Sequence, residues 1–140
     1  MSLDAVHSDA SRMTNAPAVA MPLVESLLDQ LPRAPYAIKD MSLRYVSINA
    51  AMLDLCGAKT RLEVIGRTAR DFFHEAVRQR HEALERQVMR TREPMKDRLD
   101  HCARLRGAPL WLLLSRWPVI DESNTVVGVA TIARLLDAPN

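Results

Sequence analysis

The sequence predicts one α+β domain in which an antiparallel sheet packs against several short helices and one long helix. Two observations support this fold class. Strand-like runs come as a pair at the start and as a group of three at the end, whereas helical patterns occupy the middle of the chain. This order is typical of α+β domains, because parallel α/β sheets alternate strands with helices. In addition, 140 residues of which 48% are hydrophobic are enough for a single domain with its own core.

The chain begins with a polar segment and a short helix. Residues 1–20 have no hydrophobic period and are expected to form a flexible tail. Over residues 21–33 we expect a flanking helix, because Leu23, Leu27 and Leu31 repeat at a spacing of four. This apolar stripe is wider than so short a helix buries alone. It therefore predicts a contact either with the outer face of the chain's own sheet or with a second copy of the chain.

The main domain is expected over residues 34–137, and it opens with two strands and several short helices. The runs PYAIKD and RYVSIN predict a hairpin around a polar turn. Asn49 offers its side-chain oxygen to the first amides of the helix AAMLDLC, and Gly57 suits the left-handed end of that helix. Thr60 and Thr68 are each followed three residues later by an acidic residue, which predicts two further turns with capping boxes.

One amphipathic helix dominates the centre of the chain. Its inner stripe, with spacings of 4, 4, 3 and 4 residues, consists of Phe73, Val77, His81, Leu84 and Val88. Such spacings place side chains on one face of a helix. The opposite face consists of Arg78, Gln79, Glu82, Glu85 and Arg86. Charges of opposite sign stand four residues apart on that face and attract one another in water.

Three strands are expected after this helix. Pro94 cannot continue a helix and favours an extended backbone before it, so the helix should end near Thr91. Weak alternation of apolar and polar residues over 95–103 predicts the first of the three strands. The long apolar run 110–120 and the run 125–135 predict the other two, joined by a polar turn.

In this order the motifs resemble a PAS domain, from about Leu23 to Leu136. The resemblance is carried by PYAIKD, LRYVSINAAMLDLCG, EVIGRTARDFF, the long helix and the closing WPVIDESNTVVGVATIARLL. The chain is most similar to the amino-terminal PAS modules that precede helix-turn-helix output domains in bacterial regulators of the AraC and LuxR types. The resemblance implies the PAS fold, in which a five-stranded antiparallel sheet covers one side of a cavity and the helices cover the other.

One face of the run 110–120 is expected to point into that cavity. Period-two alternation places Leu112, Leu114 and Arg116 on one face of the strand and the side chains between them on the other. The resemblance implies that the face with Arg116 points inward. The alternative is that the opposite face does. A buried Arg116 needs a partner, because an unpaired buried charge is strongly unfavourable. We expect one of three arrangements: Arg116 extends to the cavity rim, it pairs with a carboxylate inside the protein, or it binds the carboxylate or phosphate of a small ligand. The predicted ligand pocket is lined by Met52, Leu55, Phe73, Val77, His81, Leu84, Leu112, Leu114 and Arg116.

The other face of the run 110–120 is apolar, and a domain on its own rarely leaves such a face in water. It and the leucine stripe of the first helix are expected to cover each other, within one chain or across a homodimer, and we expect the homodimer. The predicted dimer interface consists of Leu23, Leu27, Leu31, Trp111, Leu113 and Trp117.

His81 bears on the question of a cofactor. It is expected either to be hydrogen-bonded to a neighbour or to contact an organic ligand. RQRHEALERQ also resembles the helix of oxygen-sensing haem PAS kinases in which a histidine binds the iron, so haem is a further alternative. GRTARDFF resembles the GRNCRFLQ stretch of flavin-binding LOV domains, but Ala69 stands where the reactive thiol would be. We therefore expect no cofactor, with haem as the exception to test.

Several classes of function are excluded by what the sequence lacks. It has no Gly-x-Ser-x-Gly turn, phosphate loop or HExxH motif, so no enzymatic activity is expected. His74 and His81 would stand about 10 Å apart along a helix, too far to share a metal ion. The net charge of +2 is too small to indicate direct binding of nucleic acid, and no apolar run is long enough to cross a membrane. Cys56 and Cys102 are expected to be the reduced thiols of a cytoplasmic protein.

The sequence thus predicts a PAS sensory and dimerisation module of a bacterial signalling or transcription-regulatory protein. It would respond to a small molecule that it binds or to a neighbouring domain. In either case it would relay the signal to an output domain beyond Asn140. That output domain is expected to be a helix-turn-helix. Two alternatives stand beside this interpretation: an interaction module whose cavity is filled by its own side chains, and a haem-binding gas sensor that uses His81.

Overall fold

The computed structural model describes residues 23–136, and the tail expected over residues 1–20 lies outside this range. The five strands form one antiparallel sheet in the order β2-β1-β5-β4-β3. They are β1 (Tyr36–Asp40), β2 (Tyr45–Ile48), β3 (Met95–Cys102), β4 (Leu110–Ile120) and β5 (Val126–Leu136). Between β2 and β3 come α3 (Ala50–Cys56), the 3-10 turns η1 (Arg61–Glu63) and η2 (Ala69–Asp71), and α4 (Glu75–Thr91). The predicted fold class is confirmed.

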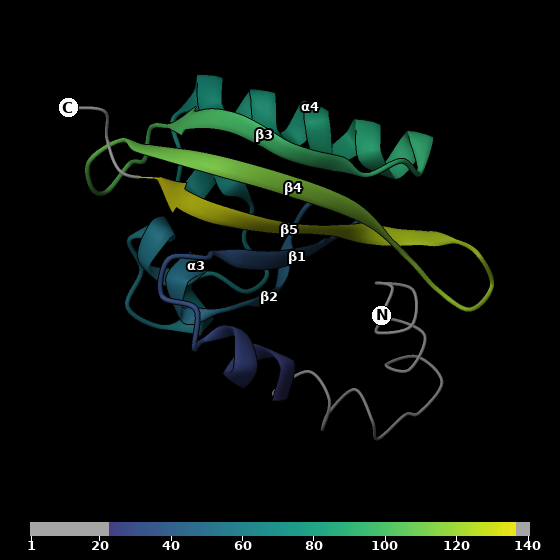
Figure 1. Cartoon of the computed structure of the whole chain (residues 1–140), viewed down its shortest axis with the longest axis horizontal. Helices are drawn as coiled ribbons and strands as arrows, with labels where there is room; N and C mark the ends of the chain where they lie inside the picture. Colours follow the sequence, from purple (N-terminus) through teal and green to yellow (C-terminus); the bar gives the residue numbers. More distant parts are fainter. Residues whose placement is uncertain (1–22, 137–140) are drawn as a thin grey trace.

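The helices are placed against different parts of the sheet. Figure 1 shows α4 running alongside β3 and β4, while α3 lies near β1 and β2. The long hairpin β4–β5 spans the centre of the sheet, and its register pairs Leu114 with Ala133 and Arg116 with Thr131. The gap between α4 and this hairpin is therefore bordered by the middle of the two longest strands.

Within the described residues, the helix near the start of the chain covers 23–28 and therefore ends before residue 33, where it was expected to end. The Glu25 carboxylate accepts hydrogen bonds from the Ile48 amide and the Ser47 hydroxyl, at 3.2 and 3.1 Å, so this helix sits at the end of β2. Pro32 disfavours a helical backbone at the residue before it, which helps to end the helix early. The leucine stripe is not covered within the chain: the exposed fractions of Leu23, Leu27 and Leu31 are 58%, 61% and 44%.

Asn49 joins the first helix, β1 and α3. Its Oδ1 accepts hydrogen bonds from the amides of Met52 and Tyr36, and its Nδ2 donates to the carbonyls of Leu28 and Ala34. The predicted cap is thus confirmed, and so is the left-handed end of α3 at Gly57, where φ is 68°. A short polar side chain that bonds in all four directions is well suited to this fully buried junction.

The two predicted capping boxes differ in outcome. Glu63 accepts hydrogen bonds from the amides of Lys59 and Thr60, as expected for the turn η1. At η2 the prediction was wrong, because the Thr68 side chain makes no capping hydrogen bond. There the Asp71 amide donates a hydrogen bond to the Thr68 backbone carbonyl. The tight 3-10 turn thus provides an acceptor for this amide, and the Thr68 hydroxyl is not needed.

Helix α4 ends at Thr91 as predicted, and Arg92 follows in the left-handed conformation with φ of 63°. The predicted inner stripe is confirmed at Val77 and Val88, which are buried, while Phe73 is buried but precedes the helix. One residue was placed on the wrong face. Glu85, expected among the solvent-facing side chains, is 3% exposed and points at the sheet. The reason is that Val77, His81 and Glu85 are spaced four residues apart and lie on one face of the helix. A stripe chosen by hydrophobicity alone includes Leu84 in place of Glu85.

On the predicted outer face of α4, Gln79 and Arg86 are exposed as expected, whereas the side chains of Arg78 and Glu82 are only 20% and 19% exposed. Arg78 and Arg86 both lie within ion-pair distance of Glu82, at 3.9 and 4.0 Å. Such pairs on a helix surface contribute little stability. They do place a carboxylate near the guanidinium of Arg78, so the charge of Arg78 is compensated by its own helix.

Strand β4 alternates as predicted. Leu112, Leu114 and Arg116 are buried on the face towards the helices, while Trp111 and Trp117 are half-buried on the other face. The side chains between α4, α3 and the sheet form a large apolar cluster, and a smaller cluster lies towards the end of α4. The inward face of β4 therefore combines two leucines of the core with one buried cation.

Candidate functional site

A cavity of about 40 Å³ lies between α4 and the sheet. It has room for about three water molecules, each of which needs roughly 10–15 Å³ on this measure. Its walls are mostly apolar, and eight of the nine side chains predicted for the pocket line it. These are Met52, Leu55, Phe73, Val77, His81, Leu112, Leu114 and Arg116. Their role in binding a ligand stays a prediction.

The ninth residue, Leu84, lies outside the lining. It packs against the smaller cluster with Val88 and Leu43 at the end of α4. The cause is the same rotation that turns Glu85 inward, since adjacent helical positions are about 100° apart around the axis. The predicted pocket was therefore wrong at this position.

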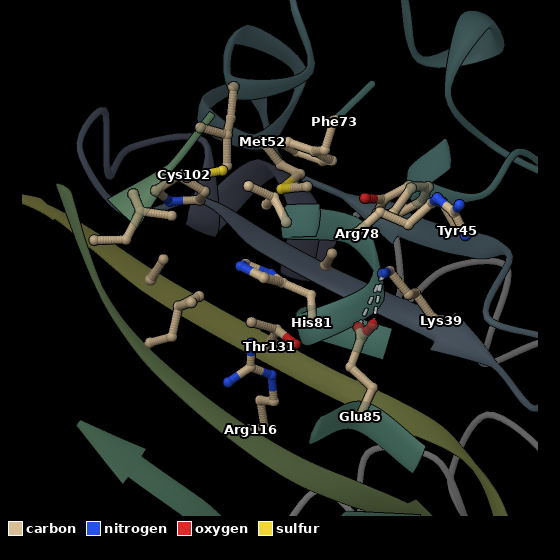
Figure 2. Close-up of a pocket in the computed structure, with 18 residues that line it drawn as sticks. Lys39, Tyr45, Met52, Phe73, Arg78, His81, Glu85, Cys102, Arg116 and Thr131 are labelled. Atoms are coloured by element: carbon tan, nitrogen blue, oxygen red, sulfur yellow. Dashed lines mark hydrogen bonds and ion pairs between the residues drawn. The ribbon is translucent and has the colours of Figure 1, made fainter. Parts of the chain in front are cut away.

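Lys39 and Glu85 form a buried ion pair at one end of the cavity. The Lys39 Nζ is 2.9 Å from both carboxylate oxygens of Glu85, and both side chains are almost entirely buried. The same Nζ lies 4.8 Å from the centre of the Tyr45 ring, within reach of a cation–π attraction. Figure 2 shows the pair with its dashed contacts beside the cavity. Its two charges compensate each other, so this end of the cavity is close to neutral.

Sequence reasoning missed this pair. A signal for the lysine was present, because Ala37 and Lys39 alternate along β1 and share its inward face. Nothing local indicated that Glu85 would meet it, since the two residues are 46 positions apart. Period-two alternation thus places Lys39 inside, and the partner is decided by how α4 lies on the sheet.

His81 and Asp100 form a second pair at the cavity. The His81 Nε2 is 2.5 Å from one Asp100 oxygen, and an Arg80 nitrogen donates to the other at 2.6 Å. The contact of His81 has the distance of an ion pair but not the geometry of a hydrogen bond, so its Nε2 has no hydrogen-bond partner among the described residues. Burial on its own raises the pKa of Asp100, but the contacts with His81 and Arg80 outweigh it and lower that pKa to about 2. The carboxylate of Asp100 is therefore ionised at neutral pH. The imidazole also stacks on the Phe73 ring, with 6.5 Å between centroids.

Arg116 differs from both pairs. It is 1% exposed, and none of its three guanidinium nitrogens has a hydrogen-bond partner among residues 23–136. Burial lowers the pKa of Arg116, while the more distant carboxylates of Glu85 and Asp100 oppose that shift. Figure 2 shows the guanidinium pointing into the cavity next to Thr131, on the same side as His81. Of the alternatives predicted for Arg116, a position at the cavity rim is contradicted by its burial, and no carboxylate among residues 23–136 is hydrogen-bonded to it.

The two cysteines are buried and free of disulfides. Burial raises the pKa of Cys56 and of Cys102 to about 12, so neither thiol is ionised at neutral pH. Cys102 lines the cavity together with Ala69, the residue at the position of the reactive thiol in the LOV-like stretch. A protonated thiol is a poor nucleophile, so the cavity wall offers no activated cysteine.

Other kinds of site were sought over residues 23–136. No cluster of three or more His, Cys, Asp and Glu side chains is placed to hold a metal ion in that range. Likewise, none of the helices there is long and apolar enough to cross a bilayer.

The chain was compared with known families and structures. The family described as "PAS fold" matches residues 28–136. No curated protein matched the sequence. Among solved structures, the Vibrio cholerae VqmA dimer, described with LuxR-type receptors, is 25% identical with a TM-score of 0.70; the match covers 80% of this chain and 49% of VqmA.

Two further structures are similar. A phage VqmA in complex with DPO is 25% identical with a TM-score of 0.70, and the match covers 89% of this chain and 56% of that one. A PAS domain from Colwellia psychrerythraea is 15% identical with a TM-score of 0.63, which shows the fold alone; 79% of this chain and 92% of that one are covered. The chain thus spans about half the length of the VqmA proteins it resembles.

Proposed function

Because the chain belongs to the PAS fold family, we propose that it is a sensory module that binds a small molecule in the cavity between α4 and the sheet. The bound state would bias the arrangement of the sheet and its flanking helices and pass that bias to an output domain. The similarity to VqmA supports this proposal, because VqmA has been solved with the ligand DPO and in a complex of ligand and DNA. We propose no enzymatic activity and a cytoplasmic location.

The observation that carries the proposal is the cavity itself. Protein interiors are close-packed and rarely leave voids larger than a water molecule without a reason. Here apolar walls surround a few polar groups that converge from α4, β1 and β4, which is the usual make-up of a small-molecule site. The residues of the predicted pocket that meet at this cavity are those we assign to ligand binding.

A protein-interaction module with a filled cavity is the second candidate. It is favoured by the small size of the cavity, about 40 Å³, which a few side-chain movements would close. In that case dimerisation would be the main activity. VqmA forms a dimer, and we propose a homodimer here through Leu23, Leu27 and Leu31, whose side chains are exposed.

A haem is not part of this proposal. His81 is already paired with Asp100, and the cavity is far smaller than a porphyrin, so binding would require both a broken pair and a rearranged core. We expect purified protein to be colourless and to stay so after haem is added and excess removed. An intense visible absorption band that is lost in His81→Ala would support the gas-sensor alternative instead.

Native mass spectrometry of freshly purified protein tests the proposed function. We expect a bound species, or a small-molecule screen in which some compounds raise the melting temperature, because a ligand that binds only the folded state stabilises it. The cavity-filling variant Ala133→Leu should lose both effects, whereas Ala83→Leu, on the exposed face of α4, should keep them. Absence of any bound species and of any stabilising compound would contradict ligand sensing and favour the interaction module.

A further inference from the structure

The unpartnered guanidinium of Arg116 is the feature of this molecule that its own fold does not explain. A buried charged group normally has a partner, because burial without one is strongly unfavourable. All three nitrogens of Arg116 lack one among the described residues, although the side chain is 1% exposed and lines the cavity. Five N–H donors are thus aimed into the cavity region without an acceptor. Such an arrangement is completed by a group that brings acceptors and negative charge.

The other charges at the cavity are already compensated. Glu85 is paired with Lys39, and Asp100 is paired with His81 and held by Arg80. Arg78, which also lines the cavity, lies within ion-pair distance of Glu82 and Glu75 on the outer side of α4. Among the described lining residues, Arg116 is therefore the one cation whose charge no contacting carboxylate balances.

We propose, on the basis of the proposed function, that the ligand of this cavity is a compact monocarboxylate whose anionic group binds Arg116. A guanidinium presents two parallel N–H groups that match the two oxygens of a carboxylate. One carboxylate balances one uncompensated charge, whereas a phosphate dianion would bring a second charge that no further unpaired arginine or lysine of the described lining balances. The apolar walls at Leu112, Leu114 and Met52 would then contact a short hydrocarbon tail.

The size of the cavity limits the ligand further. With about 40 Å³ available, the molecule would be similar in size to acetate or propionate, unless the side chains move on binding. Binding of so few atoms is weak in absolute terms, since the gain per non-hydrogen atom is bounded. Millimolar concentrations are therefore the range in which to look.

Thermal shift measurements on the full chain test the proposal, with sodium acetate and propionate as probes. The neutral isosteres acetamide and propionamide, with sodium chloride at equal ionic strength, are the matched comparisons. We expect the carboxylates to raise the melting temperature in a saturable way and the amides and chloride to fail at the same concentrations. Equal stabilisation by amide and carboxylate would overturn the proposal.

Variants at the site sharpen this test. Arg116→Met should weaken carboxylate binding by about 10- to 100-fold, the range expected when a charged hydrogen bond is lost. Arg90→Met, which removes an exposed guanidinium outside the cavity lining, should bind like the wild type. Without ligand, Arg116→Met should melt at least as high as the wild type, because it removes an unpaired buried charge. A lower melting temperature would show that the guanidinium is a structural group and would overturn the proposal.

Two further measurements separate this inference from the proposed function. In NMR spectra of the wild type, the Arg116 Nε–Hε signal should shift on addition of propionate and not of propionamide, and this readout needs no variant to fold. If native mass spectrometry finds a neutral bound molecule and the Arg116 signal does not respond to propionate, the carboxylate is wrong while the sensor stands. If neither a bound molecule nor any stabilising compound is found, both are wrong.

Discussion

Asn49 and Arg116 are both buried polar side chains, with exposed fractions of 0% and 1%, yet their surroundings are opposite. Every hydrogen-bonding group of Asn49 that reaches across the α3 junction is used, by two amide donors and two carbonyl acceptors. No described residue bonds to the guanidinium of Arg116. A polar residue that holds a fold together is satisfied by the fold itself. A buried polar residue that lacks hydrogen-bond partners next to a cavity is better explained by a ligand that binds in the cavity.

The largest expected effect comes from creating a second unpaired cation. Glu85→Leu leaves Lys39 buried without its carboxylate and should lower the free energy of unfolding by about 3–5 kcal/mol in urea titrations. The control Glu75→Leu, whose side chain is 74% exposed, should lower it by less than about 1 kcal/mol. The double variant Lys39→Met with Glu85→Leu should regain most of the loss.

The outcome for Glu85→Leu bears directly on Arg116. If this variant unfolds at the same urea concentration as the wild type, unpaired cations are tolerated around the cavity. The lack of a partner at Arg116 would then carry no information about a ligand.

The next largest effect on the free energy of unfolding is expected at Asn49, whose hydrogen-bonding groups are used by the fold. Asn49→Ala removes the cap of α3 and leaves the amides of Met52 and Tyr36 without their acceptor, so we expect a loss of about 3 kcal/mol in the free energy of unfolding. Asn49→Ser keeps a hydroxyl that can cap the Met52 amide and should lose about half as much. Equal losses for the two variants would show that the cap contributes little at this junction.

The pair of His81 and Asp100 predicts a dependence on pH. The pKa of Asp100 is about 2 in the folded chain, below its usual 3.8, so its ionised form stabilises the fold above about pH 4. That stability is lost as the pH falls from about 4 towards 2, and we expect about 1 kcal/mol after allowing for partial solvent screening. Asp100→Asn should be less stable at neutral pH and should show a flatter pH profile in thermal melts. An unchanged profile would contradict the pairing with His81 and Arg80.

The smallest effect on stability is expected at the leucine stripe, where the change is in assembly instead. Leu27→Glu should leave the free energy of unfolding within about 0.5 kcal/mol of the wild type, because the side chain is exposed in the monomer. It should convert a dimer to a monomer in analytical ultracentrifugation at micromolar concentration. Leu62→Glu is the matched control, since Leu62 is 90% exposed and lies outside the predicted interface. A wild type that sediments as one chain would rule out the homodimer.

Much of the fold could be read from the sequence because local rules decide it. The cap at Asn49, the left-handed Gly57 and the helix end before Pro94 depend on neighbouring residues only, and the structure confirms them. The division of β4 into two faces was also predictable, because side chains alternate along a strand whatever it packs against, and the resemblance to PAS domains indicated which face points inward. The inner face of α4 was less so, since hydrophobicity indicated Leu84 and the helix turns Glu85 inward.

What the sequence by itself determined was the order of strands and helices, most of their ends, and that Arg116 would share one face of β4 with Leu112 and Leu114. Only the tertiary structure decided how the charges are shared: that Lys39 meets Glu85, that His81 meets Asp100, and that Arg116 meets neither acid. The physical reason is that caps and alternation act over a few residues, whereas an ion pair depends on the distance between side chains brought together from remote parts of the chain. The placement of α4 on the sheet therefore decides whether the guanidinium of Arg116 meets a carboxylate of the helix.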